Sequence, residues 1–403
     1  MTGDDQYRDA IGRQVKTARK LAGLTQQQLA ERAHLSLSLV KQVEQTRVPA
    51  SPAFIAAVAR ALHIPATQLM GQPYPIDTRE DHRIHAVIPD LRRELTAYRL
   101  PPEPGITPRP LPELATAVDH ASRLRHAATF DTLGAELPAL LAELRTATHH
   151  HTGHDRERAY GLLAETYYAA DQLTSQLGYT DLASIAVDRY EWAATHSSDP
   201  LAILIGDYRR AGELINAADW NSALRLLANA RAQLEPELGT ASPATWSTWG
   251  NLHLKSGLAA ARAGDADTAD AHLAEAQQAA THTGERDDYR LAFGPTNVAI
   301  WSVALAVEQR DGTKAITRAH DVHFHPTTPP ERIGHHWIDL ARGHQLHGNR
   351  HKALQALQHA RHTSPQQTRY HPQVRETITT LATQDRYRTN TLANLARWAG
   401  IHI

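Results

Sequence analysis

The stretch "LTQQQLAERAHLSLSLVKQVEQ", residues 24–45, decides how the front of this 403-residue chain folds. Thr25 stands at the start of a helical pattern, and Gln28 follows three residues later. This is the spacing of a capping box, in which the two side chains bond each other's backbone N–H groups at the first turn of a helix. A second helical pattern begins after only a few residues. The stretch therefore predicts two short helices, 25–33 and 36–45, joined by a tight turn.

Three further short helices flank this pair. Apolar residues recur at helical spacing before it, and a Ser-Pro helix start introduces another run after it. The residues that define these helices are Ile11, Val15, Ala18 and Leu21, with Gly23 as the stop; Ser51, Pro52, Ile55, Val58, Ala59 and Leu62; and Pro65 and Leu69. Because helices this short cannot each bury much apolar surface, the five must share one small core. That core is either a generic helical bundle or a helix-turn-helix domain built on the central pair.

Two sequence motifs separate these interpretations. "RKLAGLTQQQLAERAHLSLSLVKQVEQ" at 19–45 and "FIAAVARALHIPATQLM" at 54–70 resemble the Cro/C1-repressor (XRE) family of DNA-binding domains. The resemblance covers about residues 9–71. It implies a five-helix domain in which one helix lies in the major groove of DNA while the preceding helix crosses the backbone. The second helix of the central pair, 36–45, is the expected reading helix.

The resemblance also assigns roles to the outer face of the reading helix. Leu37, Ser38 and Gln42 would point at base edges, because Gln42 can pair with adenine and Leu37 can touch a thymine methyl group. A helix N-terminus and nearby cationic side chains would hold phosphates. The candidate DNA-binding residues are Gln26, Ser36, Leu37, Ser38, Lys41, Gln42 and Arg47.

Two pairs of residues indicate how closely this chain follows the family. Arg19 and Glu44 match the family's buried ion pair, although two solvated surface charges would give the same sequence. His34 and Thr46 stand where the family usually has glycine. Histidine tolerates a positive φ better than most residues, whereas β-branched threonine would be strained there. We therefore expect the exit from the reading helix to have a different shape, which bears on the role of Arg47.

The segment 72–112 is predicted to be a connector. Apolar residues at helical spacing predict a helix near 84–99, but Pro89 would sit poorly in its interior and predicts a kink or a restart. Six prolines between 101 and 112 then predict an extended, semi-rigid spacer. We expect this connector to join the DNA-binding domain at 1–71 to the rest of the chain.

A turn followed by an alanine recurs through the back of the chain. The occurrences are "GYTDLA", "ADWNSA", "GDADTA", "RDGTKA" and "GNRHKA", which end at Ala183, Ala223, Ala269, Ala315 and Ala353 with spacings of 40, 46, 46 and 38 residues. Recurrence at this scale indicates a solenoid of stacked helix pairs. The pattern resembles tetratricopeptide repeats with longer periods; an irregular helical array is the alternative. The predicted fold is all-α, with a five-helix helix-turn-helix domain followed by a tetratricopeptide-like α-solenoid at 113–403.

The resemblance to these repeats implies an effector groove, because the first helix of each pair lines the concave side. Asn251 and Asn297 fall at the same position of two repeats. Asparagine can donate to and accept from a peptide backbone at once, although exposed asparagines that cap loops would give the same pattern. The candidate groove residues are Tyr168, Gln172, Tyr208, Asn216, Asn251, Lys255, Arg262, Asn297, Trp301 and Arg342.

The order of the parts resembles two groups of regulators: the peptide-sensing quorum regulators of Gram-positive bacteria and a large set of actinomycete regulators. The resemblance implies a sequence-specific transcriptional regulator that binds double-stranded operator DNA as a homodimer. Its repeats would bind a peptide or small-molecule effector. The alternative is a DNA-tethered protein-interaction scaffold or an antitoxin-like protein that binds a partner protein.

Charge and composition agree with a DNA-binding front. Residues 1–70 carry nine Lys/Arg and five Asp/Glu, whereas the remainder carries 33 and 38, so only the front suits a polyanion. The chain has no cysteine, begins with the polar "MTGDDQYRD", and has no apolar run long enough to span a bilayer. We expect a cytoplasmic, nucleoid-associated protein without a membrane partner.

Motifs of catalysis are missing from the sequence. It has no Gly-rich phosphate loop, no H-E-x-x-H and no G-x-S-x-G, so neither enzymatic activity nor a cofactor is expected. Two histidine clusters, "HHHTGH" at 149–154 and "HDVHFH" at 320–325, are interpreted as solvated loop histidines rather than metal ligands. A proton-sensing role for such histidines is the alternative, because imidazole titrates near neutral pH.

Overall fold

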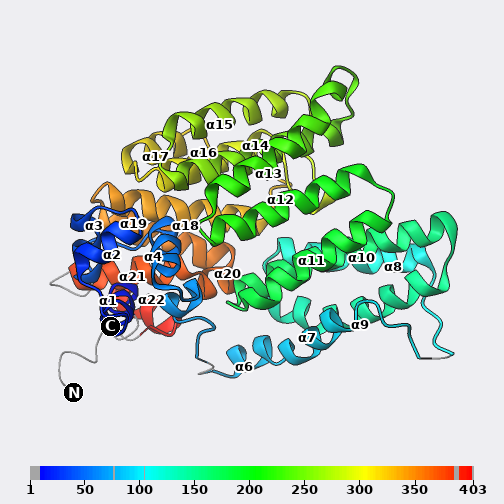
Figure 1. The fold of residues 1–403 in the computed structure, drawn as a ribbon, viewed down its shortest axis with the longest axis horizontal. Coiled ribbons are helices and arrows are strands. Elements are labelled where there is room, and N and C mark those ends of the chain that lie inside the picture. Colours follow the sequence, from blue (N-terminus) through cyan, green and yellow to red (C-terminus); the bar gives the residue numbers. More distant parts are fainter. Residues whose placement is uncertain (1–9, 76–77, 104, 385–389, 402–403) are drawn as a thin grey trace.

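The computed structural model describes residues 10–75, 78–103, 105–384 and 390–401. The regular structure of these residues is helical, and their β structure is limited to an isolated bridge between Arg286 and Phe293. A small N-terminal head lies at one end of a long array of paired helices (Figure 1). Within the described ranges, no helix has both the length and the apolar character needed to cross a lipid bilayer. The predicted all-α fold is confirmed.

The head contains the five predicted helices. They are α1 (Ile11–Leu21), α2 (Gln26–Arg32), α3 (Leu37–Glu44), α4 (Pro52–Leu62) and α5 (Ala66–Met70). Their shared core includes Val15, Leu29, Val40 and Val58, which are fully buried. Leu21 departs from the expected apolar stripe of the first helix, because it is 84% exposed. The remaining stripe residues face one core, as expected for helices too short to be stable alone.

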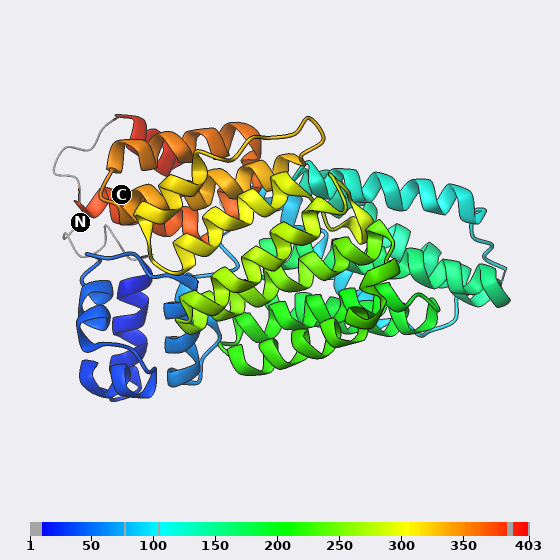
Figure 2. The same ribbon diagram turned by 90° about the horizontal axis from the view of Figure 1, so that it is seen from above.

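The array is built from consecutive helix pairs. They are α8 (Leu111–His126) with α9 (Phe130–His150), α10 (Gly153–Gln176) with α11 (Thr180–His196), α12 (Pro200–Asn216) with α13 (Trp220–Leu234), α14 (Pro243–Ala263) with α15 (Ala266–Thr281), α16 (Pro295–Glu308) with α17 (Gly312–Ala319), and α18 (Pro330–Leu346) with α19 (Arg350–Thr363). Many of these helices run side by side (Figure 2). The first helices of neighbouring pairs contact one another from α12 to α18, and α18 also reaches α8. The array therefore curls around one inner space.

The chain ends in α20 (Pro365–Tyr370), α21 (Pro372–Gln384) and α22 (Asn390–Trp398), and short 3-10 turns lie at Glu235–Thr240 and Asp288–Arg290. Of these last helices, α20 and α21 pack on α18 and α19, and α22 packs on α21. They thereby cover the final pair of the array.

The recurring alanines lie where the second helix of a pair packs on the first. All are at most 1% exposed: Ala183 in α11, Ala223 in α13, Ala269 in α15, Ala315 in α17 and Ala353 in α19. In four of the five pairs an Asp or Asn caps the second helix by accepting from a backbone N–H: Asp219, Asp265, Asp311 and Asn349. The turn motif thus places a buried alanine in all five repeats and supplies a side-chain cap in four of them. The predicted helical repeat domain is confirmed.

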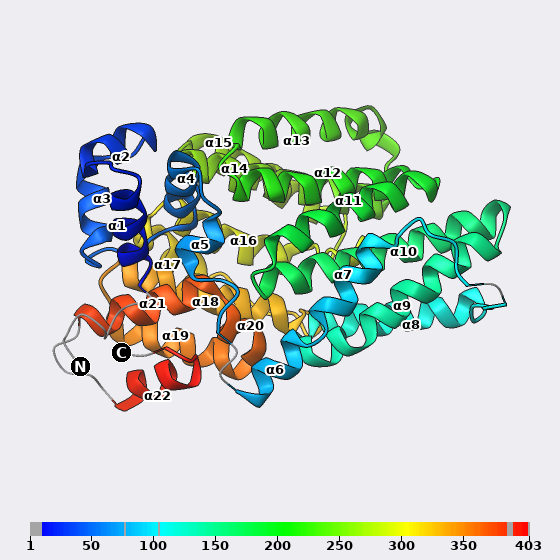
Figure 3. The ribbon, with the colours of Figure 1, turned by 60° about the horizontal axis from the view of Figure 1, so that its bottom comes forward.

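Two short helices connect the head to the array: α6 (Arg79–His85) and α7 (Ile88–Thr96). Pro89 lies in the first turn of α7, where its missing N–H leaves no intrahelical bond unmade, so the chain restarts at this point. Leu91 and Leu95 are buried among side chains of the array, and α7 packs on α9 and α11. The connector helices therefore lie along the array (Figure 3).

The head docks on two distant parts of the array. Arg60 Nη1, on α4, donates to the carbonyl oxygen of Ala218 in the turn between α12 and α13, at 2.9 Å. The backbone N–H of Ala50 donates to Oε1 of Glu376, on α21, at 2.8 Å. A turn from the middle of the array and a helix near its end therefore both hold the head.

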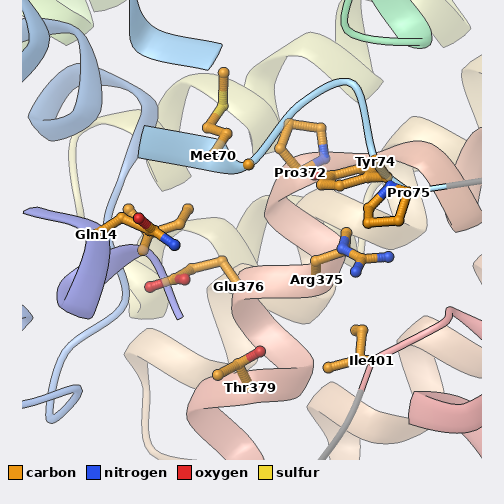
Figure 4. Close-up of a pocket in the computed structure, with 11 residues that line it drawn as sticks. Gln14, Met70, Tyr74, Pro75, Pro372, Arg375, Glu376, Thr379 and Ile401 are labelled. Carbon is orange, nitrogen blue, oxygen red and sulfur yellow. The ribbon is translucent and has the colours of Figure 1, made fainter. Parts of the chain in front are cut away.

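A small cavity of about 100 Å³ lies where α21 faces the head (Figure 4). Tyr74 and Arg375 line it, and the guanidinium carbon of Arg375 lies 4.0 Å from the centre of the Tyr74 ring. Burial raises the pKa of Glu376 to about 7, although the backbone N–H groups of Ala50 and Ile11 act in the opposite direction. Burial therefore outweighs the two hydrogen bonds from the head and favours the protonated form of this carboxyl group below about pH 7.

We predict that Glu376→Gln changes how stability depends on pH. The pKa of Glu376 is about 7 in the folded protein against an ordinary value of 4.5, so the unfolded chain releases this proton first as pH rises. The wild-type free energy of unfolding should fall across that interval, and the variant should gain on the order of 2–3 kcal/mol relative to wild type. Denaturant unfolding at pH 5 and pH 8 measures this gain.

Glu275→Gln is the matched control, because Glu275 is exposed on α15 and lies outside the head contact. Its pH dependence should equal that of the wild type. If the free energy of unfolding of Glu376→Gln depends on pH as that of the wild type does, the prediction is contradicted.

Candidate DNA-binding helix and effector cavity

The two caps predicted for the central helix pair are present. Thr25 Oγ1 accepts from the backbone N–H of Gln28 at 3.2 Å, and Gln28 Oε1 accepts from the backbone N–H of Thr25 at 2.9 Å. Ser36 Oγ accepts from the backbone N–H of Leu39 at 3.2 Å. These bonds satisfy N–H groups that the first turns of α2 and α3 leave free, and so fix where both helices begin.

A buried ion pair joins α3 to α1. Arg19 Nε and Nη2 donate to the two carboxylate oxygens of Glu44 at 2.6 and 2.9 Å, and Arg19 Nη1 donates to the carbonyl oxygen of Leu24 at 2.7 Å. The hydrogen bonds to Glu44 raise the pKa of Arg19. Gln26 Nε2 donates to the same carboxylate at 2.7 Å, so this candidate phosphate-binding residue also ties α2 to α3. The expected ion pair is confirmed, and it sets the angle of α3.

The outer face of α3 carries the predicted reading residues. Ser38, Lys41 and Gln42 are exposed, and Gln42 Nε2 lies 3.4 Å from Ser38 Oγ, to which it donates. Leu37 is half-buried, because part of its side chain packs on the core of the head. Arg47, just after the helix, is exposed. The side chains on this face are therefore mainly polar and cationic.

The head turns a different face toward the array. A space of about 940 Å³ lies between them and is lined on the head side by α4, by Leu39 and by the α2–α3 turn from Arg32 to Leu35. Ser38, Lys41 and Gln42 do not line this space. Docking on the array therefore leaves the outer face of α3 exposed.

Both residues that replace the family's glycines have a positive φ. His34 has φ 54° in the turn before α3, and Thr46 has φ 55° just after α3. The backbone N–H of Thr46 donates to the carbonyl oxygen of Val43 at 2.8 Å, which holds the threonine in this conformation. The strain expected at Thr46 is therefore present, because a β-branched residue rarely adopts the left-handed region.

We predict that Thr46→Gly stabilises the head by about 1 kcal/mol, because glycine adopts the left-handed region without steric strain. His34→Gly should gain only a few tenths of a kcal/mol by the same argument, since histidine tolerates positive φ better. Thermal unfolding of the two variants measures the difference. A Thr46→Gly variant no more stable than wild type would show that the buried threonine side chain outweighs the strain.

A cavity of about 300 Å³ opens on the inner side of the array. Nine of the ten candidate groove residues line it: Tyr168, Gln172, Tyr208, Asn216, Asn251, Lys255, Arg262, Asn297 and Trp301. They come from α10, α12, α14 and α16, which are the first helices of their pairs. Arg342 does not line the cavity, because its guanidinium group bonds Glu308 and Asp339.

The two repeat-related asparagines have different partners. Asn251 Nδ2 donates to the carbonyl oxygen of Ser247 in the preceding turn of its own helix, at 3.1 Å. Asn297 Nδ2 donates to the carbonyl oxygen of Ala292, and Asn297 Oδ1 accepts from Arg332 Nε at 2.8 Å. Both asparagines are buried. Asn297 thus orients Arg332. The side-chain oxygen Oδ1 of Asn251, by contrast, has no hydrogen bond within the described residues.

A loop that the sequence analysis did not assign completes the cavity. It contains "ERDDYRLAFGP" at 285–295, between α15 and α16. Arg290 Nε donates to Glu165 at 2.7 Å, and the carbonyl oxygen of Arg290 accepts from Arg125 Nη2 at 2.6 Å. Tyr289 and Arg290 have φ of 52° and 60°, a strained conformation that these contacts maintain. The feature of the sequence that could have indicated this loop is its five charged residues between two helices.

A buried network runs from the cavity toward the head. Arg262 Nε and Arg342 Nη2 each donate to a different oxygen of Glu308, both at 2.9 Å. Burial raises the pKa of Glu308, but the two guanidinium groups lower it by more, so the carboxylate is held charged. Arg262 lines both the inner cavity and the space beside the head. Arg342 lines a smaller space with Ala50 of the head.

The two histidine clusters lie away from this cavity. His149 and His150 end α9, and His154 lies in the first turn of α10. The cluster at 320–325 follows α17 and is mostly exposed. In the described part of the chain, no group of three or more His, Asp or Glu side chains is arranged to hold a metal ion.

Comparisons with known proteins agree with the geometry of the head. Residues 10–69 match the family model described as "Helix-turn-helix domain". The immunity repressor protein of Bacillus phage phi105 is 33% identical over 92 residues, which cover 21% of this chain and 64% of the repressor. The chain thus spans less than two thirds of the length of this curated relative. The head is a repressor-type helix-turn-helix domain, and a helical repeat domain follows it.

Two solved structures show a weak similarity to this chain. BtubC (BKLC) from P. vanneervenii is 15% identical, with a TM-score of 0.37, over 69% of this chain and 94% of that chain. PlcR from Bacillus thuringiensis, solved with the peptide PapR7 and DNA, is 16% identical, with a TM-score of 0.27, over 67% of this chain and 94% of that chain. These scores are too low to transfer the arrangement of the helices.

Proposed function

We propose that this protein is a sequence-specific, DNA-binding transcriptional regulator. The observation that carries the proposal is the outer face of α3, where Ser38, Lys41 and Gln42 are exposed on a helix fixed by the Arg19–Glu44 ion pair. A helix supported in this way fits the major groove of B-DNA, while the preceding helix crosses the backbone. Lys41 and Arg47 would then contact phosphates on either side of the bases that Gln42 reads.

The regulator is proposed to act as a homodimer in the cytoplasm. Each head offers one reading helix, and operators of helix-turn-helix proteins are usually two half-sites about one turn of DNA apart. A twofold dimer presents two reading helices in the orientation that inverted half-sites need. Selection of duplexes from a random library by the purified protein should therefore return paired half-sites. No preference for any duplex over random competitor would refute the proposal.

We predict that Gln42→Ala reduces discrimination between the selected operator and a single-base-pair variant by about 1–3 kcal/mol, because a bidentate amide contact is lost. Competition titrations at one fixed salt concentration measure it. Gln68→Ala removes the same amide from an exposed position on α5 and should leave discrimination unchanged. Equal discrimination by Gln42→Ala and wild type would remove Gln42 from the reading residues.

The inner cavity is the proposed effector site. Its volume of about 300 Å³ is at the lower end of the range of ligand pockets, which suits a small molecule or one end of a short peptide. Tyr208 and Trp301 offer aromatic surface, and Asn251 offers a carbonyl oxygen. Most of the other lining residues are polar or charged, so the cavity suits a ligand with polar or charged groups that fix its orientation.

The buried network supports a route from this site to the head. Arg262 belongs to the cavity wall, Glu308 bonds both Arg262 and Arg342, and Arg342 lies beside Ala50. A ligand that moves Arg262 would change the bonds of Glu308 and hence the surface on which the head docks. Couplings of this kind are typically worth about 1–3 kcal/mol.

We predict that Arg262→Met loosens the head without preventing folding of the array, because methionine replaces the unbranched aliphatic part of the arginine side chain but cannot bond Glu308. Hydrogen–deuterium exchange of residues 49–62 should become faster, by up to about tenfold if the coupling lies near the lower end of the usual range. Arg225→Met, at an exposed position on α13, is the matched control. Unchanged hydrogen–deuterium exchange in Arg262→Met would show that Arg262 does not couple the cavity to the head.

A further inference from the structure

Lys255 lies on α14 in the wall of the effector cavity and is 8% exposed. Its Nζ lies 4.2 Å from the centre of the Tyr208 ring. Gly212 also faces this ammonium group, because a Cβ at Gly212 would lie 3.7 Å from Nζ. The lysine side chain is therefore enclosed by protein, with its charged end at the cavity.

Five cationic side chains and three carboxylates line this cavity, and most of the charges are paired. The ion pairs are Arg209 with Asp171, Arg262 with Glu308, Arg290 with Glu165 and Asp119, and Glu331 with Arg125 and His126. Within the described residues, Lys255 and Arg332 form no ion pair with a carboxylate. Arg332 Nε donates instead to the neutral oxygen of Asn297. Glu213, which accepts a hydrogen bond from Ser184, also forms no ion pair, so two positive charges and one carboxylate of the described wall are not in ion pairs.

An ammonium group that is buried without a counter-charge is unfavourable. Burial lowers the pKa of Lys255 to about 7, and the guanidinium groups of Arg209, Arg262 and Arg332 act in the same direction, whereas the carboxylate of Asp171 acts in the opposite direction. Lys255 therefore binds its proton weakly in the free site. A bound anion would stabilise the protonated ammonium form. Arg332 is held by Asn297, and its guanidinium carbon lies 5.7 Å from the centre of the Trp301 ring.

We propose that Lys255 and Arg332 receive an anionic group, a carboxylate or a phosphate, of the ligand that occupies this cavity. Tyr208 and Trp301 contact the apolar or aromatic part of the ligand next to that group. The ligand is then a small acid, or a peptide end with a free carboxyl group. This inference rests on the proposed role of the cavity as the effector site and adds the chemistry that the site recognises.

The six lysines of the chain allow a direct test on the wild-type protein. With 13C at the ε-carbon of lysine, NMR resolves each side chain, and loss of one signal in Lys255→Gln assigns Lys255. The probes are succinate, inorganic phosphate, and an acetylated dipeptide with either a free or an amidated C-terminus, each against a chloride background. Succinate and the free dipeptide test a carboxylate; phosphate tests the other source of negative charge.

We expect the Lys255 signal to respond to at least one anion and not to the amidated dipeptide. The apparent pKa of Lys255 should rise from about 7, since a bound anion stabilises the ammonium form. Affinity for the anion should fall as pH rises above 7, because the free site loses its proton there. A Lys255 signal that no anion shifts, or that chloride shifts equally, overturns the proposal.

Affinity measurements on variants give an independent readout. Lys255→Gln should weaken binding of the effective anion by about 10- to 100-fold, the loss of one charge-assisted hydrogen bond. Lys255→Arg keeps the positive charge and should bind better than Lys255→Gln. Lys352→Gln makes the same change at an exposed position on α19 and should bind as the wild type does. Equal affinity of Lys255→Gln and wild type refutes the assignment.

The outcome is separable from that of the DNA experiment. If the protein binds the anion at Lys255 but prefers no duplex, the anion site is supported and the regulator proposal is refuted. If the protein selects an operator but no anion affects Lys255, the regulator proposal is supported and the anion site is refuted.

Discussion

The close approach of paired helices at the buried alanines is the constraint on which this structure depends. A larger side chain at Ala223 or Ala269, both fully buried, would push the second helix of the pair away from the first. The pairs could then no longer stack so that their first helices face one inner space. The proposed effector cavity lies on that inner side, and the turn at Ala218 that holds the head lies at the edge of the same stack. One packing rule therefore positions both sites.

Signals between residues close in sequence predicted most of the helices. The Thr25–Gln28 capping box and the Ser36 cap each involve residues three positions apart, and both are present. The same holds for the Asp or Asn that caps a second helix a few residues before its alanine. The resemblance to tetratricopeptide repeats, together with helical register, also predicted residues such as Lys255 and Trp301 in one groove, and both line the inner cavity.

Contacts between distant segments could not be predicted in this way. Glu376 meets the backbone of Ala50, 326 positions away, and this contact depends on the curvature of the whole array. The loop with Arg290 likewise reaches Glu165 only because α10 and the loop face the same inner space. Register marked Asn297 as a groove residue, but nothing in the sequence shows that Arg332 occupies its oxygen. The hydrogen-bond partners of the side chains inside the cavity could be identified only from the three-dimensional structure.

The attachment of α6 and α7 to the array limits how far the head can travel. Eight residues separate Met70 from Arg79, and a fully extended chain of that length spans roughly 30 Å. A head released from Ala218 and Glu376 would stay tethered within this radius, at an effective concentration on the order of millimolar. Return to the array would be an intramolecular step, independent of protein concentration. Release is therefore self-reversing, and a bound ligand only has to bias it.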